Sequence, residues 1–283
     1  MSRIAYVNGL YTRHAEACVH IEDRGYQFAD GVYEVWAVFG GRLADAEGHF
    51  TRLDRSLSEL KIPAPMSLAA LQLVLRETIR RNRVIDGMVY LQITRGVARR
   101  EHAFPVPEVS PSVVITARSI DYTAAEAKAA QGVAVVTMPD IRWGRCDIKS
   151  VSLLPNVLAK QAAREQGAYE AWLVDKDGQV TEGSSTNAWI IDEKGRLRTR
   201  DTGANILRGI TRTSLMALAQ ELQIQVIETP FTVEEAKSAS EAFITAASAF
   251  VTPVVSIDGD PVGNGRPGPI ALRLRQLYLE QTR

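Results

Sequence analysis

The sequence has only two cysteines, and they lie far apart. Cys18 and Cys146 form no C-x-x-C motif, and a chain of 283 residues is long enough to build a core without disulfides. We therefore expect two free thiols, which is typical of proteins in a reducing cytoplasm.

An excess of charge and long apolar runs are also missing. The 33 Lys and Arg residues balance 33 Asp and Glu residues, so the chain offers no general attraction for nucleic acid or an anionic membrane. The longest uncharged stretch, 242–257, contains Ser, Thr and Pro and falls short of the about 20 apolar residues that a membrane helix needs. The apolar run 4–7 is too short for a signal-peptide core. We expect a cytoplasmic protein without nucleic acid or membrane partners.

Signatures of metal, dinucleotide and serine-hydrolase chemistry are absent or incomplete. The four histidines have no metal-ligand spacing, so no metal site is expected. Residues 263–268 match G-x-G-x-x-G, but the 15 residues after them cannot complete a dinucleotide-binding unit. A surface turn before a helix that begins at Pro269 is the better interpretation. Residues 183–185 lack the G-x-S-x-G pattern of serine hydrolases.

The N-terminal part of the sequence mixes strands and helices. Apolar residues recur every three or four positions in two segments, which predicts helices over 46–60 and 68–79. Asn8-Gly9 predicts a tight hairpin turn. β-Branched and aromatic residues predict strands over 32–39, 89–94 and 112–117.

A change of composition suggests a second domain. Residues 118–131 are rich in Ala, Glu and Lys without an apolar stripe, which indicates a connection between domains. The strands expected beyond it are 133–137, 171–174, 188–191, 225–227 and 242–245. The helices expected there lie near 156–166, 211–222 and 233–239. This mixture predicts an α+β protein, with a small domain over 1–120 and a large domain over 121–283.

Three segments carry residue types suited to catalysis. Lys149 follows bulky and apolar neighbours, and a desolvated lysine can act as a Schiff-base nucleophile, although most lysines at strand ends are simply exposed. Glu182 precedes Ser184 and Ser185, a set that can bind a heteroaromatic nitrogen or form an ordinary hydroxyl-rich loop. Residues 207–212 lead into a helix whose first amides can bind phosphate or be capped in the usual way.

Taken together, these segments resemble the fold-type-IV pyridoxal-phosphate enzymes, which include D-amino-acid and branched-chain aminotransferases. The resemblance runs from the hairpin at 8–9 to a loop at 251–253 and is strongest to the D-amino-acid branch. The segments that carry it are 22–34, 94–96, 100–102, 142–150, 181–185 and 207–211.

The resemblance implies pyridoxal 5′-phosphate as the cofactor, in a cleft between the two domains. Lys149 would hold it as a Schiff base and move a proton between the substrate Cα and the cofactor C4′. Glu182 would keep the pyridine nitrogen protonated. Both roles agree with the chemistry of the residue types.

The resemblance also assigns the remaining cofactor-binding residues. Arg52 and the amides of Ile210 and Thr211 would bind the phosphate, Leu207 would lie against the ring, and Ser185 would complete the set.

One segment departs from the family pattern. A loop after the strand at 243–245 commonly supplies Ser and Thr hydroxyls to the phosphate, whereas this chain has Ala246 and Ala247, followed by Ser248. Ala246 and Ala247 cannot supply these hydroxyl donors, so the phosphate site would lack part of the family's usual set.

For the substrate, the resemblance implies that Tyr33 binds its carboxylate together with Arg100 and His102 of a neighbouring subunit. A homodimer whose site is completed across the interface is therefore expected. The implied reaction is ping-pong transamination between a D-amino acid such as D-alanine and a 2-oxo acid such as 2-oxoglutarate.

Three alternatives remain at this stage. A branched-chain L-amino-acid aminotransferase would share Lys149 and Glu182 but would not need Arg100 and His102. An (R)-selective amine transaminase would also dispense with a carboxylate site. A non-catalytic pyridoxal-phosphate-binding protein would not need Lys149, Glu182 and Tyr33 together.

Overall fold

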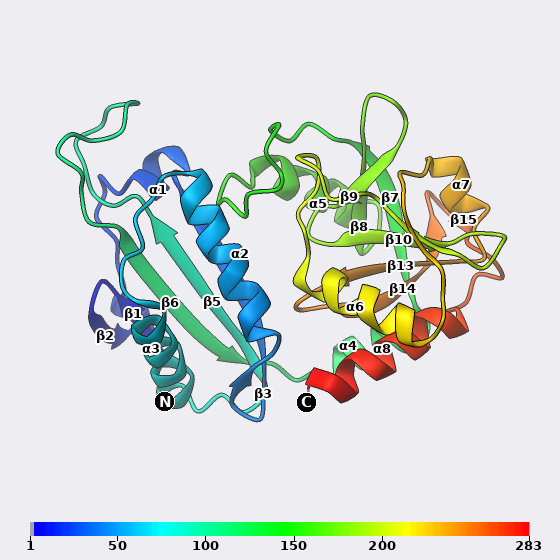
Figure 1. Ribbon diagram of the computed structural model, residues 1–283, viewed down its shortest axis with the longest axis horizontal. Helices are drawn as coiled ribbons and strands as arrows, with labels where there is room; N and C mark the ends of the chain where they lie inside the picture. The colour runs from blue at the N-terminus through cyan, green and yellow to red at the C-terminus, as the bar shows by residue number, and fades with distance from the viewer. Residues whose placement is uncertain (1–2, 283) are drawn as a thin grey trace. The chain divides into compact units, whose positions relative to one another are not determined.

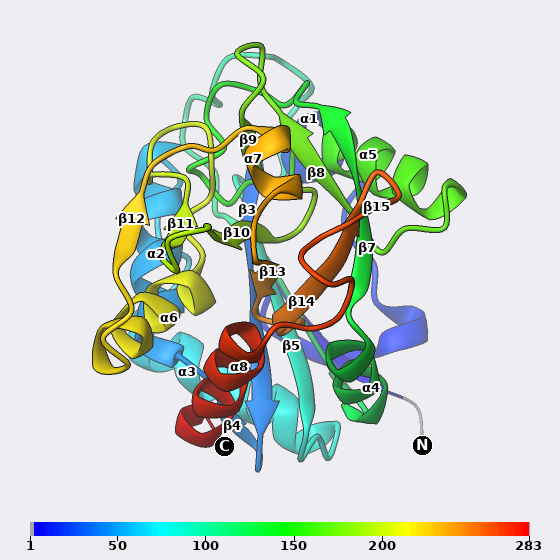
Figure 2. The same cartoon turned by 90° about the vertical axis from the view of Figure 1, so that its right-hand side faces the viewer.

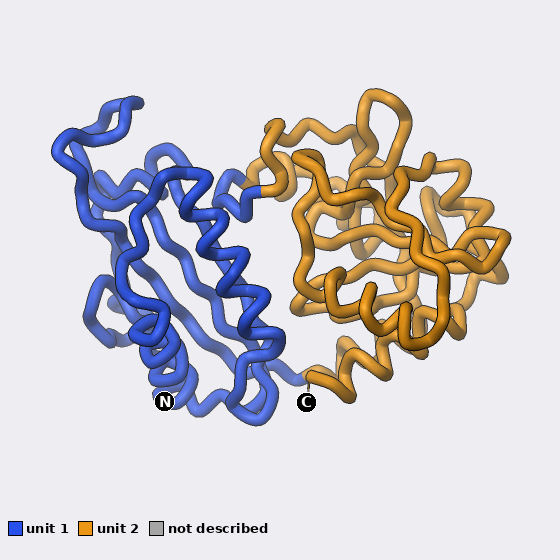
Figure 3. The backbone as a smooth tube through the Cα atoms, in the orientation of Figure 1, with its two compact units in different colours: residues 1–121, 148–152, 283 blue, residues 122–147, 153–282 orange. Residues whose placement is uncertain are grey.

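The computed structural model describes residues 3–282, and their contacts divide into two compact units (Figure 3). Unit 1 comprises residues 3–121 and Ile148–Ser152, and unit 2 comprises Tyr122–Asp147 and Leu153–Thr282. The segment Ile148–Ser152, which the sequence analysis assigned to the large domain, belongs to unit 1 because its backbone pairs with a strand there.

Unit 1 contains a six-stranded sheet in the order β2-β1-β6-β5-β3-β4, with all neighbouring strands antiparallel (Figure 1). The strands are β1 (Ile4–Val7), β2 (Leu10–Arg13), β3 (Gly31–Phe39), β4 (Arg42–Leu43), β5 (Gly87–Thr94) and β6 (Ser112–Ser119). The hairpin expected at Asn8-Gly9 joins β1 to β2, and both turn residues have positive φ, 46° and 97°. This is the backbone that Asn-Gly favours in a two-residue turn.

Two amphipathic helices cross the sheet of unit 1 in Figure 1, as their periodicity predicts. They are α2 (Ala46–Glu59) and α3 (Leu68–Arg81), and shorter helical segments are η1 (His14–Glu16) and α1 (Arg24–Phe28). The apolar faces of α2 and α3 join side chains of the sheet in one core. Its members include Trp36, Phe50, Leu53, Leu57, Leu71, Leu75, Ile79, Leu91 and Ile115.

Unit 2 contains a nine-stranded mixed sheet in the order β12-β11-β10-β13-β14-β7-β8-β9, with β15 beside β14. Three neighbouring pairs are parallel (β11 with β12, β14 with β7, β7 with β8), and the others are antiparallel. The strands are β7 (Val133–Pro139), β8 (Glu170–Val174), β9 (Val180–Gly183), β10 (Asn187–Ile191), β11 (Leu197–Thr199), β12 (Val226–Glu228), β13 (Glu241–Ala246), β14 (Phe250–Ile257) and β15 (Asp260–Pro261). The α+β class is confirmed.

The helices of unit 2 are seen best in Figure 2. They are α4 (Thr123–Gln131), α5 (Leu154–Glu165), α6 (Ile210–Glu221), α7 (Val233–Lys237) and α8 (Pro269–Thr282). α8 packs on β14 and α5 on β8. The C-terminal helix expected after the 263–268 turn begins at Pro269, as predicted.

The boundary between the two units, after Asp121, lies within the connection expected at 118–131. That stretch also contains the end of β6 and the helix α4, which was not expected because it is Ala-rich, buries only Ala129 and so has no apolar stripe to reveal it. The loop expected at 251–253 is wrong, because these residues lie inside β14. Pro253 is tolerated there because pairing with β7 begins one residue later, at Val254.

Over residues 3–282, no helix is long and apolar enough to cross a membrane, and no group of three or more His, Cys, Asp or Glu side chains is arranged to hold a metal ion. Cys18 and Cys146 are both free, as expected, with Cys18 exposed and Cys146 half-buried.

A buried ionic group fastens α2 to the sheet of unit 1. Glu34 on β3 is fully buried, and its carboxylate accepts hydrogen bonds from Arg52 Nε and Nη2, both at 2.8 Å. His49 Nδ1 lies 2.7 Å from the same carboxylate. Burial alone would oppose ionisation of Glu34, but the charge and hydrogen bonds of Arg52 outweigh it and lower the pKa of Glu34 to about 2.

We expect Glu34→Gln to destabilise unit 1 by about 3–5 kcal/mol at pH 7, because it leaves the Arg52 guanidinium buried without its anionic partner. The difference in free energy of unfolding between the wild type and this variant should be complete above pH 4.5, the ordinary pKa of a glutamate. It should disappear as the pH falls toward 2 and Glu34 becomes protonated in the folded protein. Urea unfolding at several pH values, read by hydrogen exchange in α2 peptides, measures both effects.

Glu59→Gln is the matched control, since Glu59 lies on the same helix and forms a 3.8 Å ion pair with Arg55 at the surface. Glu59→Gln should lower the free energy of unfolding by less than about 1 kcal/mol. An equal cost for the two variants, or a pH-independent difference, would show that the buried ion pair is not what holds α2.

Candidate active site

The backbone of Lys149 is fixed on both sides. The Tyr33 amide on β3 donates to the Lys149 carbonyl at 3.0 Å, and the Val151 amide donates to the Gly31 carbonyl at 3.0 Å. On the other side, the Lys149 amide donates to Ser56 Oγ of α2 at 3.3 Å. The segment Ile148–Ser152 therefore runs along the edge of the N-terminal half of β3.

The side chain of Lys149 lies on an aromatic surface. Its Nζ is 4.3 Å from the centroid of the Tyr33 ring, and Tyr33 stacks on Tyr90 with ring centroids 5.8 Å apart. Burial, together with the neighbouring Tyr33, raises the pKa of Tyr90 to about 12. The structure thus brings together Lys149 and Tyr33, two residues that the sequence analysis assigned to catalysis and substrate binding.

Arg52, the expected phosphate ligand, is buried on α2 and held by Glu34 through the two bonds described above. Burial lowers the pKa of His49, so the neutral imidazole can donate Nδ1–H to the Glu34 carboxylate. Glu34 and His49 were missed from the sequence. A carboxylate in the middle of an apolar strand was the available signal, because such a group requires a buried partner.

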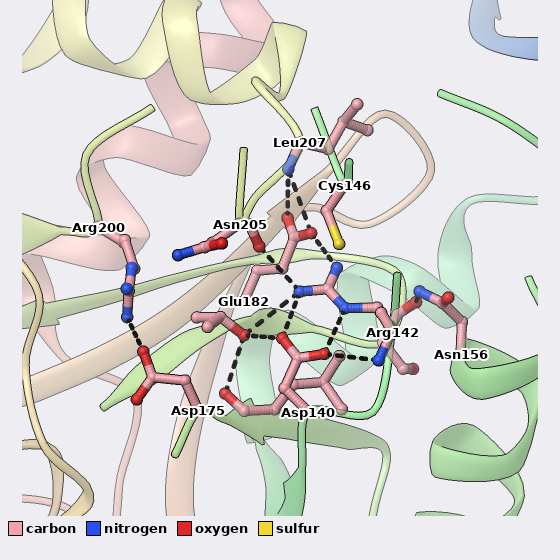
Figure 4. A network of polar contacts seen from close by, with 12 residues as sticks. Asp140, Arg142, Cys146, Asn156, Asp175, Glu182, Arg200, Asn205 and Leu207 are labelled. Carbon is pink, nitrogen blue, oxygen red and sulfur yellow. Dashed lines mark hydrogen bonds and ion pairs between the residues drawn. The ribbon is translucent and has the colours of Figure 1, made fainter. Parts of the chain in front are cut away.

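In unit 2, the Glu182 carboxylate on β9 is surrounded by hydrogen-bond donors (Figure 4). Arg142 Nη1 donates to Oε1, and Asn187 Nδ2 donates to Oε2 at 2.9 Å. The Leu207 amide points at both oxygens, at 3.2 and 3.1 Å. All three groups are donors, which favours the ionised form of Glu182.

Arg142 bridges two carboxylates in this network (Figure 4). Its Nε and Nη2 bond both oxygens of Asp140 at 2.9 and 2.7 Å, while Nη1 reaches Glu182. Burial opposes the charge of Arg142, but the two carboxylates more than compensate and raise its pKa; Arg142 in turn lowers the pKa of Asp140. Arg142 was missed from the sequence, although the Asp-x-Arg spacing after a buried strand was a usable signal.

The N-terminus of α6 lies next to Glu182. Its N-cap residue, Gly209, provides no side-chain cap, and the first amides of a helix have no acceptor within it. A Cβ on Gly209 would lie 2.1 Å from Asn187 Oδ1, so any larger residue would have to displace the Asn187 amide. Asn187 Nδ2 also bonds the Leu207 carbonyl at 2.9 Å, and one side chain therefore connects the Glu182 carboxylate to the start of the helix.

Ser185 is already engaged as a donor. Its Oγ donates to Glu170 Oε2 at 2.8 Å, and Ser184 Oγ donates to Oε1 of the same fully buried carboxylate. Lys160 lies 3.3 Å from Glu170. Glu170 was missed from the sequence, and it determines the orientation of both hydroxyls.

Arg100 and His102 lie in the loop after β5, with both side chains exposed. The structure brings them together against one ring: the Arg100 guanidinium carbon is 4.9 Å from the Phe28 centroid, and the His102 ring is 5.4 Å from it. Phe28 was missed from the sequence, because its spacing from these residues gave no signal.

The residues present fit pyridoxal 5′-phosphate. A lysine on an aromatic surface suits the aldehyde, an ionised carboxylate suits a protonated pyridine nitrogen, and an uncapped helix N-terminus suits a phosphate. The carboxylate and the helix N-terminus lie in one unit and are connected through Asn187.

Comparisons with known proteins agree with this chemistry. The sequence profile of amino-transferase class IV matches residues 31–257. D-alanine aminotransferase from Staphylococcus haemolyticus is 41% identical over 271 residues, covering 96% of this chain and 95% of the relative. The same-named protein from Bacillus licheniformis is 42% identical over 263 residues, covering 93% and 91%.

Solved structures show the same fold. The branched-chain amino acid aminotransferase of Escherichia coli superposes with a TM-score of 0.91 at 26% identity, covering 100% of this chain and 95% of that one. A T.th. branched-chain amino acid aminotransferase with pyridoxamine 5′-phosphate gives 0.90 at 26% identity, covering 100% and 94%. Enzymes of this class use pyridoxal 5′-phosphate. With a profile that spans most of its length and such relatives over nearly all of it, the chain belongs to the class IV aminotransferases.

Proposed function

We propose that this enzyme transfers the amino group of a D-amino acid, such as D-alanine, to a 2-oxo acid, such as 2-oxoglutarate. The observation that carries the proposal is the 41% identity to D-alanine aminotransferase over 96% of the chain. Lys149 on the Tyr33 ring and the donor-rich environment of Glu182 supply groups that the reaction needs.

When bound, the cofactor supplies a carbonyl that condenses with amines and a pyridine ring that withdraws electrons from the substrate Cα. Lys149 would bind the carbonyl carbon and, once the substrate amine has displaced it there, would carry the proton between Cα and C4′. Glu182 holds the proton at the pyridine nitrogen. Its three donors support this role, because a carboxylate kept ionised stabilises a cationic ring nitrogen beside it.

For the phosphate we propose Arg52 together with the amides of Ile210 and Thr211, supported by the uncapped start of α6. Leu207 lies against the ring in this proposal, and Ser185, whose hydroxyl donates to Glu170 at 2.8 Å, completes the set.

The substrate carboxylate is bound by Tyr33, Arg100 and His102. Arg provides a planar fork of donors matched to a carboxylate, and His and Tyr add single donors. When the carboxylate and the amino group are both fixed, only one enantiomer directs Cα–H to Lys149, and the names of the relatives support the D form.

We further propose a cytoplasmic homodimer in which Arg100 and His102 serve the neighbouring subunit's site. The segments 19–26 and 97–106 are joined by a bridge between Asp23 and Val97 and carry large exposed apolar side chains. These are Val19, Ile21, Tyr26, Val97, Phe104 and Val106. An apolar surface of this kind is typical of an interface. The two free cysteines support the compartment.

A branched-chain L-amino-acid aminotransferase is the second candidate, because the structural neighbours carry that name. Their 26% identity is well below the 41% of the D-alanine enzymes. A half-reaction separates the candidates. D-alanine or L-alanine is added to the holoenzyme without an acceptor, and the absorbance of the bound cofactor is followed. We expect fast conversion with D-alanine alone, whereas a preference for L-alanine or L-leucine would overturn the proposal.

Lys149→Ala should abolish transamination while the protein remains folded, because it removes both the covalent attachment and the proton carrier. Borohydride reduction followed by peptide mapping should locate the cofactor on Lys149 in the wild type. Lys194→Ala, which changes an exposed lysine in a hairpin, is the control and should retain full activity. Cofactor attached to another lysine would refute the assignment.

Glu182→Gln should slow removal of the Cα proton by about ten- to a hundredfold, because a hydrogen bond to a charged group is worth about 1.5–3 kcal/mol. Substrate binding should change little. Stopped-flow half-reactions with Cα-deuterated D-alanine isolate the step. The exposed Glu193→Gln is the charge-matched control. An unchanged rate constant would remove Glu182 from this role.

Arg100→Ala should lower kcat/KM for D-alanine by about ten- to a hundredfold, because it removes a hydrogen bond to a charged group, which contributes about 1.5–3 kcal/mol. D-alaninol, which carries a hydroxymethyl group in place of the carboxylate, should be affected far less. Arg99→Ala removes a neighbouring exposed arginine from the same loop and is the control. Equal losses on the two substrates would mean that Arg100 does not bind the carboxylate.

A further inference from the structure

The loop that carries Arg100 and His102 is wrapped around a buried guanidinium. Arg24 on α1 is 3% exposed, and its Nη1 donates to the carbonyls of Glu101 at 2.6 Å and Ala103 at 3.3 Å. Its Nη2 donates to the carbonyl of His102 at 3.3 Å. One side chain thus binds three consecutive carbonyl oxygens of the loop.

The remaining donor of the Arg24 side chain, Nε, bonds a carboxylate of unit 1. Its Nε donates to Asp30 Oδ2 at 2.8 Å, and Asp30 also accepts from Arg95 Nε at 2.7 Å and Nη2 at 3.0 Å. Arg95 in turn donates to the carbonyls of Leu60 and Lys61. Two buried guanidinium groups share one carboxylate, so backbone carbonyls must supply the remaining acceptors. The loop conformation is therefore coupled to Arg24.

The same helix also contacts the two side chains that the loop presents. Phe28 lies one turn after Arg24, and the Arg24 guanidinium carbon is 4.9 Å from its ring centroid. Arg100 lies at the same distance from this ring, and the His102 ring is 5.4 Å away. Arg24 thus fixes the loop backbone, and Phe28 is the surface on which Arg100 and His102 rest.

We propose that Arg24 and Phe28 are positioning residues for carboxylate recognition, holding Arg100 and His102 in the conformation that binds the substrate carboxylate. The inference rests on the proposed function, in which these two residues bind that group.

Exposure of the loop side chains explains why such a device is needed. Arg100 and His102 are exposed in the single chain, so burial within their own subunit does not restrict their rotamers. A long side chain loses much conformational freedom when it binds, and a site ordered in advance avoids this loss. Arg24 and Phe28 should therefore act on substrate affinity and not on proton transfer at Cα.

Arg24→Lys and Phe28→Leu test the inference in the holoenzyme. Lysine keeps the positive charge beside Asp30 but cannot bond the carboxylate and three carbonyls at once. Leucine keeps an apolar side chain but removes the aromatic face. We expect each to raise the KM for D-alanine about tenfold with kcat changed less than threefold, and to leave kcat/KM for D-alaninol within about twofold of wild type.

Arg81→Lys is the matched control. Arg81 on α3 also lies over an aromatic ring, 4.0 Å from the Tyr11 centroid, and pairs with Glu77 at 2.7 Å. It should behave as wild type on both substrates. Hydrogen exchange in peptides covering 97–106 gives a readout independent of turnover, and it should accelerate in Arg24→Lys and not in Arg81→Lys.

A double-mutant cycle separates positioning from a general loss of structure. In an Arg100→Ala, His102→Ala background, Arg24→Lys and Phe28→Leu should add no further rise in KM, because nothing is left to position. A full additional rise there, or equal losses on D-alanine and D-alaninol, overturns the inference.

The two proposals can fail separately. If Arg100→Ala raises the KM for D-alanine but Arg24→Lys and Phe28→Leu do not, the positioning role is wrong and carboxylate binding by Arg100 stands. If Arg100→Ala itself has no effect on D-alanine, both the carboxylate role and the positioning inference are overturned.

Discussion

Backbone pairing along one edge of β3 determines where the reactive lysine lies. Ile148–Ser152 uses the edge of the N-terminal half of the strand, and β4 uses that of the C-terminal half. Successive side chains of a strand point to opposite faces. Tyr33 therefore meets Lys149, while its neighbour Glu34 turns to α2. One strand thus fixes the lysine, its aromatic support and the ion pair that fastens α2.

Both units bury guanidinium groups, and each of these groups needs acceptors for its N–H donors. In unit 2, Arg142 is shared between two carboxylates, which raises its pKa and keeps Glu182 surrounded by donors. In unit 1, Arg24 and Arg95 share a single carboxylate, Asp30. Main-chain carbonyls supply the remaining acceptors there, so these two guanidinium groups fix the course of the backbone around them.

Sequence alone predicted the elements with strong local signals. The apolar periodicity of α2 and α3 and the Asn8-Gly9 turn depend only on residues that are close together in the sequence. α4 has no apolar face, so it was missed. Motif resemblance supplied Lys149 and Glu182. It could not supply their partners, because Arg142 and Glu182 are 40 positions apart and Arg24 and Glu101 are 77 apart. A chain with 33 positive and 33 negative side chains allows too many pairings for spacing to select one.

The bonds from Arg24 to the loop have an evolutionary consequence. They end on main-chain oxygens, which every amino acid possesses, so the identity of residues 101–103 is not dictated by the guanidinium that holds them. Mutation can exchange the side chains presented at positions 100 and 102 while the backbone beneath them keeps its shape. A lineage built on this scaffold can therefore explore new amine donors by single substitutions, without first having to evolve a new loop.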